Sequence, residues 1–261
     1  MKQLLVNADD FGFTRDVNAG IVECHRNGIL TATTLMANGD AFEDAVQLAK
    51  ANPTLDIGVH LVLIGGPGQP SSIPVFLAQL VRGGWNLAAE MRNQVKTILN
   101  AGLHPSHLDT HKHTHLAPPV LRAVIQTSRE FNIPWVRKPA DFTMPAQSSP
   151  FLKKLVNKAV QFAANRFDNA LHRGGCRFTD HFTGFEVTGR LDTPELISIL
   201  RHLPDGITEL MCHPGYLREE LSSAPTRLKE SRVKELEALT SPEARAILSE
   251  TGVQLTTYRD L

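Results

Sequence analysis

Leu4-Leu5-Val6-Asn7-Ala8-Asp9-Asp10-Phe11-Gly12 is the stretch that decides the fold. Residues 4–8 form a short apolar run, which is typical of a strand buried on both faces of a parallel sheet. Two carboxylates follow directly, before a Phe-Gly pair. Active sites of parallel α/β proteins collect at the edge where the strands end. Asp9 and Asp10 are therefore candidate site residues.

Asp9 and Asp10 are expected to have different roles. Adjacent side chains of an extended strand point to opposite faces, so the two carboxylates cannot have identical roles unless the strand has already turned. In an extended strand, one would hold a metal ion and the other would accept a proton. The alternative is a structural pair that forms an Asx turn or caps the next helix.

Strands and helices are expected to alternate along the rest of the chain, with Gly and Pro at many of the boundaries. The predicted strands are residues 32–37, 57–61, 106–110, 133–137, 180–185, 207–212 and 253–257. The predicted helices are residues 16–26, 41–51, part of 85–101, 120–131, 151–164, 193–202, 227–239 and 242–251. Such alternation predicts a parallel sheet, and a chain of 261 residues has about the length of a (β/α) barrel. We expect an α/β fold with seven or eight mostly parallel strands.

A single domain is expected to span residues 1–261, because the sequence has no internal repeat, low-complexity tract or domain-splitting linker. An irregular and helical excursion is expected around residues 138–180, whose first part is rich in Pro and Ser. The charged helix over residues 227–239 is expected to be solvated.

Four histidines and one aspartate alternate along His107-Leu108-Asp109-Thr110-His111-Lys112-His113-Thr114-His115. A strand would place all five on one face, which an apolar core disfavours by roughly 1 to 3 kcal/mol for each unpartnered polar group. A helix would align the first, fifth and ninth residues, but Pro105 and Pro118 lie close to both ends. We expect a strand that stops near Thr110 and opens into a site.

Two further histidines lie at predicted strand ends. His60 is in the last third of the strand over 57–61, and His213 follows the strand over 207–212 and precedes a proline. Asp180 and His181 are expected near the same edge. Two histidines and one carboxylate around a divalent ion leave positions for water and a substrate oxygen. A second carboxylate would serve as general base and another histidine as general acid.

Composition excludes several classes of protein. Lys plus Arg and Asp plus Glu both total 27, which argues against a broad nucleic-acid-binding surface. The three cysteines form no C-x-x-C pair, which indicates a reducing compartment without a disulfide scaffold. The N-terminus becomes polar too early for a signal peptide, and no run of about 18 apolar residues predicts a membrane span. We expect a cytoplasmic protein.

The motifs resemble those of the YdjC-like family of carbohydrate deacetylases. They are residues 6–12, the Gly-x-His of Gly58 to His60, the alternating row from His107 to His115, and His213-Pro214-Gly215. The resemblance implies a single distorted TIM-like (β/α) barrel and one divalent metal ion, Mg²⁺ or Zn²⁺. It also implies an N-acetylated carbohydrate as substrate, with hydrolysis of its N-acetyl group and release of acetate.

Residue roles follow from the same resemblance. It assigns metal binding to Asp10, His60 and His111. By analogy with the related polysaccharide deacetylases, Asp9 is the base and His213 the acid. The remaining polar residues of the row would orient the metal ligands or contact substrate: His107, Asp109, His113 and His115. The expected partner is the sugar, without nucleic acid or a membrane span, and a homodimer is left open.

Two other functions remain open from the sequence. His107-x-Asp109 with a distant histidine matches the facial triad of a non-haem iron oxygenase, although that motif generally belongs to an all-β fold. A sugar- or metal-binding protein without catalysis is the second alternative, and the retention of both Asp9 and Asp10 argues against it.

Overall fold

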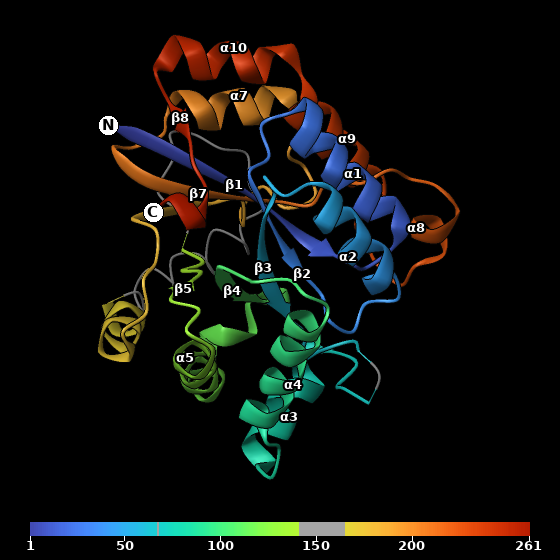
Figure 1. The fold of residues 1–261 in the computed structure, drawn as a ribbon, viewed down its shortest axis with the longest axis vertical. Coiled ribbons are helices and arrows are strands. Elements are labelled where there is room, and N and C mark those ends of the chain that lie inside the picture. Colours follow the sequence, from blue (N-terminus) through green and yellow to red (C-terminus); the bar gives the residue numbers. More distant parts are fainter. Residues whose placement is uncertain (67, 141–164) are drawn as a thin grey trace.

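A computed structural model describes residues 1–66, 68–140 and 165–261. Its sheet has eight strands, which pair in parallel throughout (Figure 1). The strands are β1 (Lys2–Phe11), β2 (Ala32–Leu35), β3 (Asp56–Leu61), β4 (His107–Thr110), β5 (Trp135–Val136), β6 (His181–Thr183), β7 (Gly206–Cys212) and β8 (Gln254–Leu255). The order is β5-β4-β3-β2-β1-β7-β6, and β8 pairs with β1. The α/β class and the parallel strands are thus confirmed.

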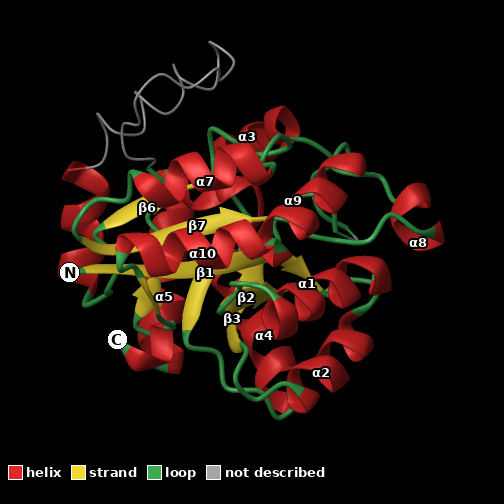
Figure 2. Cartoon of the chain, turned by 90° about the horizontal axis from the view of Figure 1, so that it is seen from above, coloured by secondary structure: helices red, strands yellow, loops and turns green. Residues whose placement is uncertain are grey.

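Helices surround the sheet, with the strands at the centre of the molecule (Figure 2). They are α1 (Arg15–Asn27), α2 (Phe42–Ala51), α3 (Ile73–Arg82), α4 (Leu87–Asn100), α5 (Pro118–Phe131), α7 (Thr193–Arg201), α8 (Glu219–Ser223), α9 (Glu230–Thr240) and α10 (Pro242–Thr251). Residues 165–174 are also helical. The predicted helix over 151–164 and the central part of the excursion from 138 to 180 lie outside the described residues.

The sheet is a curled, TIM-like half-barrel, with β5 and β6 at its two edges. An isolated parallel bridge joins Trp135 of β5 to Arg177, four residues before β6. The amide N–H of Val136 donates to the carbonyl oxygen of Arg177, at 2.9 Å. This contact brings the two ends of the sheet together without a continuous strand ladder.

Strand β1 shows how the sheet divides its two faces. Leu4, Val6 and Ala8 belong to the large apolar core that the helices share, whereas Leu5 packs in a smaller cluster with Trp135, Tyr258 and Ala32. Period 2 places Asn7 and Asp9 on the same face as Leu5. The inner face therefore changes from apolar to polar along β1, toward the carboxyl edge of the sheet.

Two expectations about particular segments were wrong, and one helix was missed. His181 pairs with Thr208 near the start of β7, so Asp180 and His181 lie at the amino-terminal ends of the strands, whereas Asp9 lies at the carboxyl ends. Helix α9 is not simply solvated, because Arg232 and Glu235 are each only 1% exposed. Helix α3 was not predicted; it follows the Gly-rich loop after β3. None of the helices in the described part of the chain is long and apolar enough to cross a membrane.

Candidate metal centre

A distortion at the end of β1 brings both aspartates to one site. The register between β1 and β2 shifts between Ala8 and Phe11, and Asp10 has φ of 71°. Asp is one of the few residue types that adopt this left-handed conformation at modest cost. The bulge cancels the alternation of the strand, so Asp9 and Asp10 face the same region. Neither caps helix α1, whose N-cap is Thr14.

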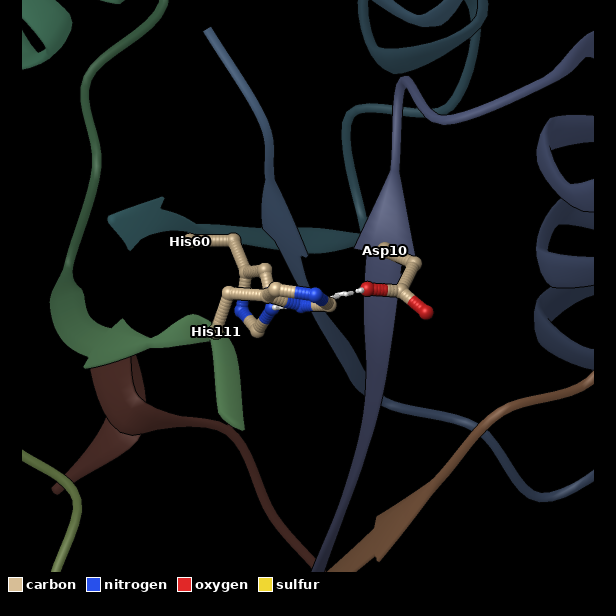
Figure 3. A group of neighbouring side chains, drawn as sticks. All are labelled: Asp10, His60 and His111. Atoms are coloured by element: carbon tan, nitrogen blue, oxygen red, sulfur yellow. Dashed lines mark hydrogen bonds and ion pairs between the residues drawn. The ribbon is translucent and has the colours of Figure 1, made fainter. Parts of the chain in front are cut away.

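Asp10, His60 and His111 converge at the carboxyl edge of the sheet (Figure 3). The Oδ1 atom of Asp10 lies 3.4 Å from Nε2 of His60 and 3.4 Å from Nδ1 of His111. The two ring nitrogens are 3.2 Å apart. His60 and Asp10 are buried, whereas the side chain of His111 is 25% exposed. The three ligand atoms are thus enclosed by protein around Asp10 and His60 and reachable from solvent beside His111.

The donor set and its spacing fit a divalent ion. Ligand atoms about 2.0 to 2.2 Å from a tetrahedral Zn²⁺ are roughly 3.3 to 3.6 Å apart, whereas those of an octahedral Mg²⁺ site are roughly 2.9 Å apart. The three separations of 3.2, 3.4 and 3.4 Å are closer to the tetrahedral value. Imidazole nitrogen also suits Zn²⁺ better than Mg²⁺. These residues can therefore hold one cation and leave a position open.

Asp109 and Thr34 orient the ring of His60 through the nitrogen that faces away from Asp10 and His111. This Nδ1 atom lies 2.7 Å from Oδ1 of Asp109 and 3.2 Å from the hydroxyl of Thr34. Burial lowers the pKa of His60, but the charge of Asp109 and hydrogen bonds with Asp10 and Asp109 outweigh burial and raise this pKa to about 10. A carboxylate on the rear nitrogen fixes the ring of a metal-binding histidine and increases its basicity.

Arg137 joins three buried carboxylates in the interior of the half-barrel. Its guanidinium donates to both oxygens of Asp9, at 2.9 and 2.7 Å, and lies 2.6 Å from Asp109 and 2.6 Å from Glu209. Burial raises the pKa of Asp9, but the charge of Arg137 outweighs it and holds this pKa well below the usual range. Burial also raises the pKa of Glu209. Asp9 is therefore ionised and fixed in place.

His213 faces Asp9, with 3.9 Å between Nε2 and Oδ2. Burial lowers the pKa of His213 to about 4, although the charges of Asp9 and Asp10 act in the opposite direction. The backbone N–H of His213 donates to Glu235 of α9, at 2.5 Å. Burial raises the pKa of Glu235 to about 7. The His213 ring is thus neutral at neutral pH and held at its backbone.

His107 supports Asp9 through an asparagine. Its Nε2 lies 3.0 Å from Oδ1 of Asn7, and the amide of Asn7 donates to Asp9 at 3.2 Å. The ring of His107 stacks on Tyr258, with 4.0 Å between centroids. A Cβ atom on Gly58 would overlap this ring, which explains the glycine of the Gly-x-His motif. His107 is only 1% exposed, so its ring is enclosed by protein.

The strand ends at Thr110, as predicted, and a 3₁₀ helix (His111–Leu116) follows. Lys112 and His113 have positive φ angles of 57° and 51°, which breaks the alternation of the row. His115 is fully buried; its Nδ1 lies 2.6 Å from the hydroxyl of Thr110, and its Nε2 lies 3.1 Å from the carbonyl oxygen of Arg137. This histidine is therefore a structural support.

His113 differs from its neighbours in the row. Its Nδ1 is buried and has no hydrogen-bond partner among the described residues. The ring packs against Phe182 and Phe185, with centroids 6.1 and 5.5 Å away. Burial and the charge of Arg137 lower the pKa of His113 well below its usual value. His113 is thus neutral and has an unused polar atom.

Arg137, Arg232 and Glu235 were not predicted as site residues. Arg137 is the last residue of the predicted strand over 133–137 and directly follows β5, and this position at the carboxyl edge was an available signal. Arg232 and Glu235 lie three residues apart on a helix rich in charged residues. Their sequence pattern does not distinguish them from the exposed charges beside them.

The fold and the site define a class: a curled parallel α/β protein with a candidate Asp-His-His metal centre at its carboxyl edge. The chain belongs to the YdjC-like protein family, whose sequence profile matches residues 3–250. This confirms the family that the motifs predicted.

Proteins with similar sequences match this chain over nearly its whole length. A carbohydrate deacetylase of Brevibacillus brevis is 33% identical, with 99% of each chain covered. A chitooligosaccharide deacetylase of Klebsiella pneumoniae is 32% identical over 99% of this chain and 98% of its own. A crystal structure of a protein from Enterococcus faecalis is 25% identical, with a TM-score of 0.76, over 99% of this chain and 98% of that one.

Proposed function

We propose that the protein is a metal-dependent hydrolase that removes an N-acetyl group from an N-acetylated sugar or oligosaccharide and releases acetate. The observation that carries this proposal is the convergence of Asp10, His60 and His111, with Asp9 and His213 beside them. The relatives named carbohydrate deacetylase and chitooligosaccharide deacetylase support the substrate class.

The metal ligands in this proposal are Asp10, His60 and His111. Zn²⁺ is favoured over Mg²⁺, since two of the three donors are imidazole nitrogens and their spacing fits a tetrahedron. When bound, such a cation supplies Lewis acidity, which polarises an amide carbonyl and makes water more acidic. Elemental analysis of the purified protein identifies the metal.

Asp9 is the proton acceptor for the attacking water. Arg137 and Asn7 fix the carboxylate, so no reorganisation is needed during the reaction. Burial raises the pKa of Asp9, but the charge of Arg137 outweighs burial and holds this pKa well below its usual range, so the carboxylate is ionised in the resting site and can accept a proton.

His213 is the proton donor to the departing amine. Because burial lowers its pKa to about 4, the imidazole is neutral in the resting site and gains its proton during the cycle. Asp9 is the source of that proton, and the 3.9 Å between the two groups must shorten to hydrogen-bond distance, by movement of the imidazole, for the transfer. The proton lost by water thus reaches the amine nitrogen as its bond to the acetyl carbon breaks.

Asp109, His107 and His115 are supporting residues in this scheme, and His113 is the member of the row that contacts substrate. The half-buried ring of His113 and its aromatic neighbours suit the apolar ring face of a sugar. The assignment of residues 1–261 to one domain, a homodimer and a cytoplasmic location stay predictions.

The decisive experiment measures acetate release from N-acetylglucosamine and its oligomers by the purified protein. Acetate release is expected to stop after chelation and to return with Zn²⁺. A folded, metal-loaded protein that releases no acetate from any N-acetylated sugar would contradict the proposal. Oxygen consumption with ferrous iron would instead support an oxygenase, and tight sugar binding without turnover would support a binding protein.

A further inference from the structure

The two carboxylate oxygens of Asp10 have different partners. Oδ1 faces the rings of His60 and His111, at 3.4 Å from each. Oδ2 accepts a hydrogen bond from Nη2 of Arg232, at 2.5 Å. Figure 3 shows this second oxygen directed away from both imidazoles. One oxygen is thus available to a cation, and an arginine occupies the other.

Arg232 is held firmly in this position. It lies in the first turn of α9 and is 1% exposed. Its Nε donates to the carbonyl oxygen of Leu228 at 3.2 Å, and its guanidinium carbon lies 6.0 Å from the ring centroid of Phe13. The N–H of Gly215 donates to the backbone oxygen of Arg232, at 3.2 Å. These contacts hold the side chain of Arg232 beside Asp10.

Asp10 is the one carboxylate that forms an ion pair with Arg232 in the part of the chain that the structure describes. A cation that approaches Oδ1 therefore meets a carboxylate whose charge is already balanced. Since the ion pair is buried, solvent screens the guanidinium only weakly from a cation at the centre.

We propose that Arg232 is a positioning residue that restricts Asp10 to ligation through one oxygen. This inference rests on the metal centre of the proposed function. The arginine weakens metal binding in two ways: it occupies the second oxygen, and its charge repels the cation. The centre keeps a position for water or a substrate oxygen that a two-oxygen carboxylate would fill.

The test compares metal affinity in Arg232→Met and the unaltered protein, by competition with a chromophoric chelator for Zn²⁺ and Co²⁺. Arg232→Met is expected to bind both ions about tenfold more tightly or better, because repulsion is removed and Oδ2 becomes free. The visible absorption of bound Co²⁺ is expected to weaken, because Co²⁺ with an additional ligand atom absorbs less strongly than four-coordinate Co²⁺. Arg232→Lys, which keeps the charge, is expected to stay near the affinity of the unaltered protein.

Arg259→Met is the matched control. It removes an Arg–Asp pair with Asp56, at 2.7 Å, outside the metal centre, and is expected to leave metal affinity unchanged. If Arg232→Met does not fold, Arg232→Gln decides, since it keeps a donor for Oδ2 but removes the charge; tighter binding is expected there too. Unchanged or weaker affinity in the folded Met or Gln variant would overturn the proposal. Because the readout is metal binding, the result does not depend on whether the protein releases acetate.

Discussion

The Nδ1 atom of His60 lies 2.7 Å from Oδ1 of Asp109, and the two residues are register partners on the adjacent parallel strands β3 and β4. The pairing places both side chains on the inner face of the sheet. Asp109 is itself fixed by Arg137, at 2.6 Å. The carboxylate therefore directs a proton to Nδ1 of His60 and leaves Nε2 for a cation.

Asp109→Asn is expected to weaken metal binding by about 10- to 100-fold, because the ring of His60 loses the charged group that orients it. Isothermal titration with Zn²⁺ measures the change. Asp205→Asn is the control, since Asp205 forms an exposed pair with the N-terminus. Equal affinity in Asp109→Asn and the unaltered protein would show that the pair has no role in metal binding.

Asp9→Asn is expected to keep its metal and to lose acetate release by about 100-fold or more, because a neutral amide accepts no proton. Its side chain is close in size to that of Asp9, and Arg137 keeps Asp109 and Glu209 as buried partners, so the fold should persist at lower stability. Acetate release and metal content are measured on the same preparation. Turnover at the rate of the unaltered protein would remove Asp9 from the role of base.

Gly58→Ala is expected to destabilise the protein by about 1 to 3 kcal/mol, because the added methyl group overlaps the ring of His107. Denaturant unfolding measures the loss. In the double variant with His107→Ala, the cost of the methyl group should largely disappear, since the ring is absent. Strictly additive effects of the two substitutions would mean that the ring is not what excludes a side chain at Gly58.

In His115→Gln, the free energy of unfolding is expected to depend less on pH under acidic conditions than in the unaltered protein. Burial lowers the pKa of His115 to about 3, whereas a histidine in an unfolded chain has a pKa of about 6.5. Between these values the unfolded chain binds a proton that the folded protein does not, so acid favours unfolding in this window.

Glutamine does not titrate and can still bond with Thr110 and with the carbonyl oxygen of Arg137. The slope of the unfolding free energy between pH 4 and 6 should therefore fall by up to about 1.4 kcal/mol per pH unit. Chemical unfolding at several pH values measures this slope. Parallel curves for the variant and the unaltered protein would contradict the expectation.

Much of the fold was readable from local patterns. The apolar run before Asp9, the stop at Gly28 and the alternation of elements predicted parallel strands, because burial and helix termination depend mainly on neighbouring residues. The candidate metal ligands were also found, since each comes from a short motif at a strand end. His181 was misplaced although it is the second residue of the predicted strand over 180–185, because the first residues of a parallel strand lie at the opposite end from the carboxyl edge.

The sequence by itself determined that Asp9, Asp10, His60, His111 and His213 gather at the ends of parallel strands. Only the tertiary structure decided how they differ. Asp10 has a left-handed backbone conformation, Arg137 forms hydrogen bonds with Asp9, and Arg232 is buried against Asp10. The last contact joins residues that are 222 positions apart in the sequence. Such contacts depend on packing across the whole sheet, so no local pattern specifies them.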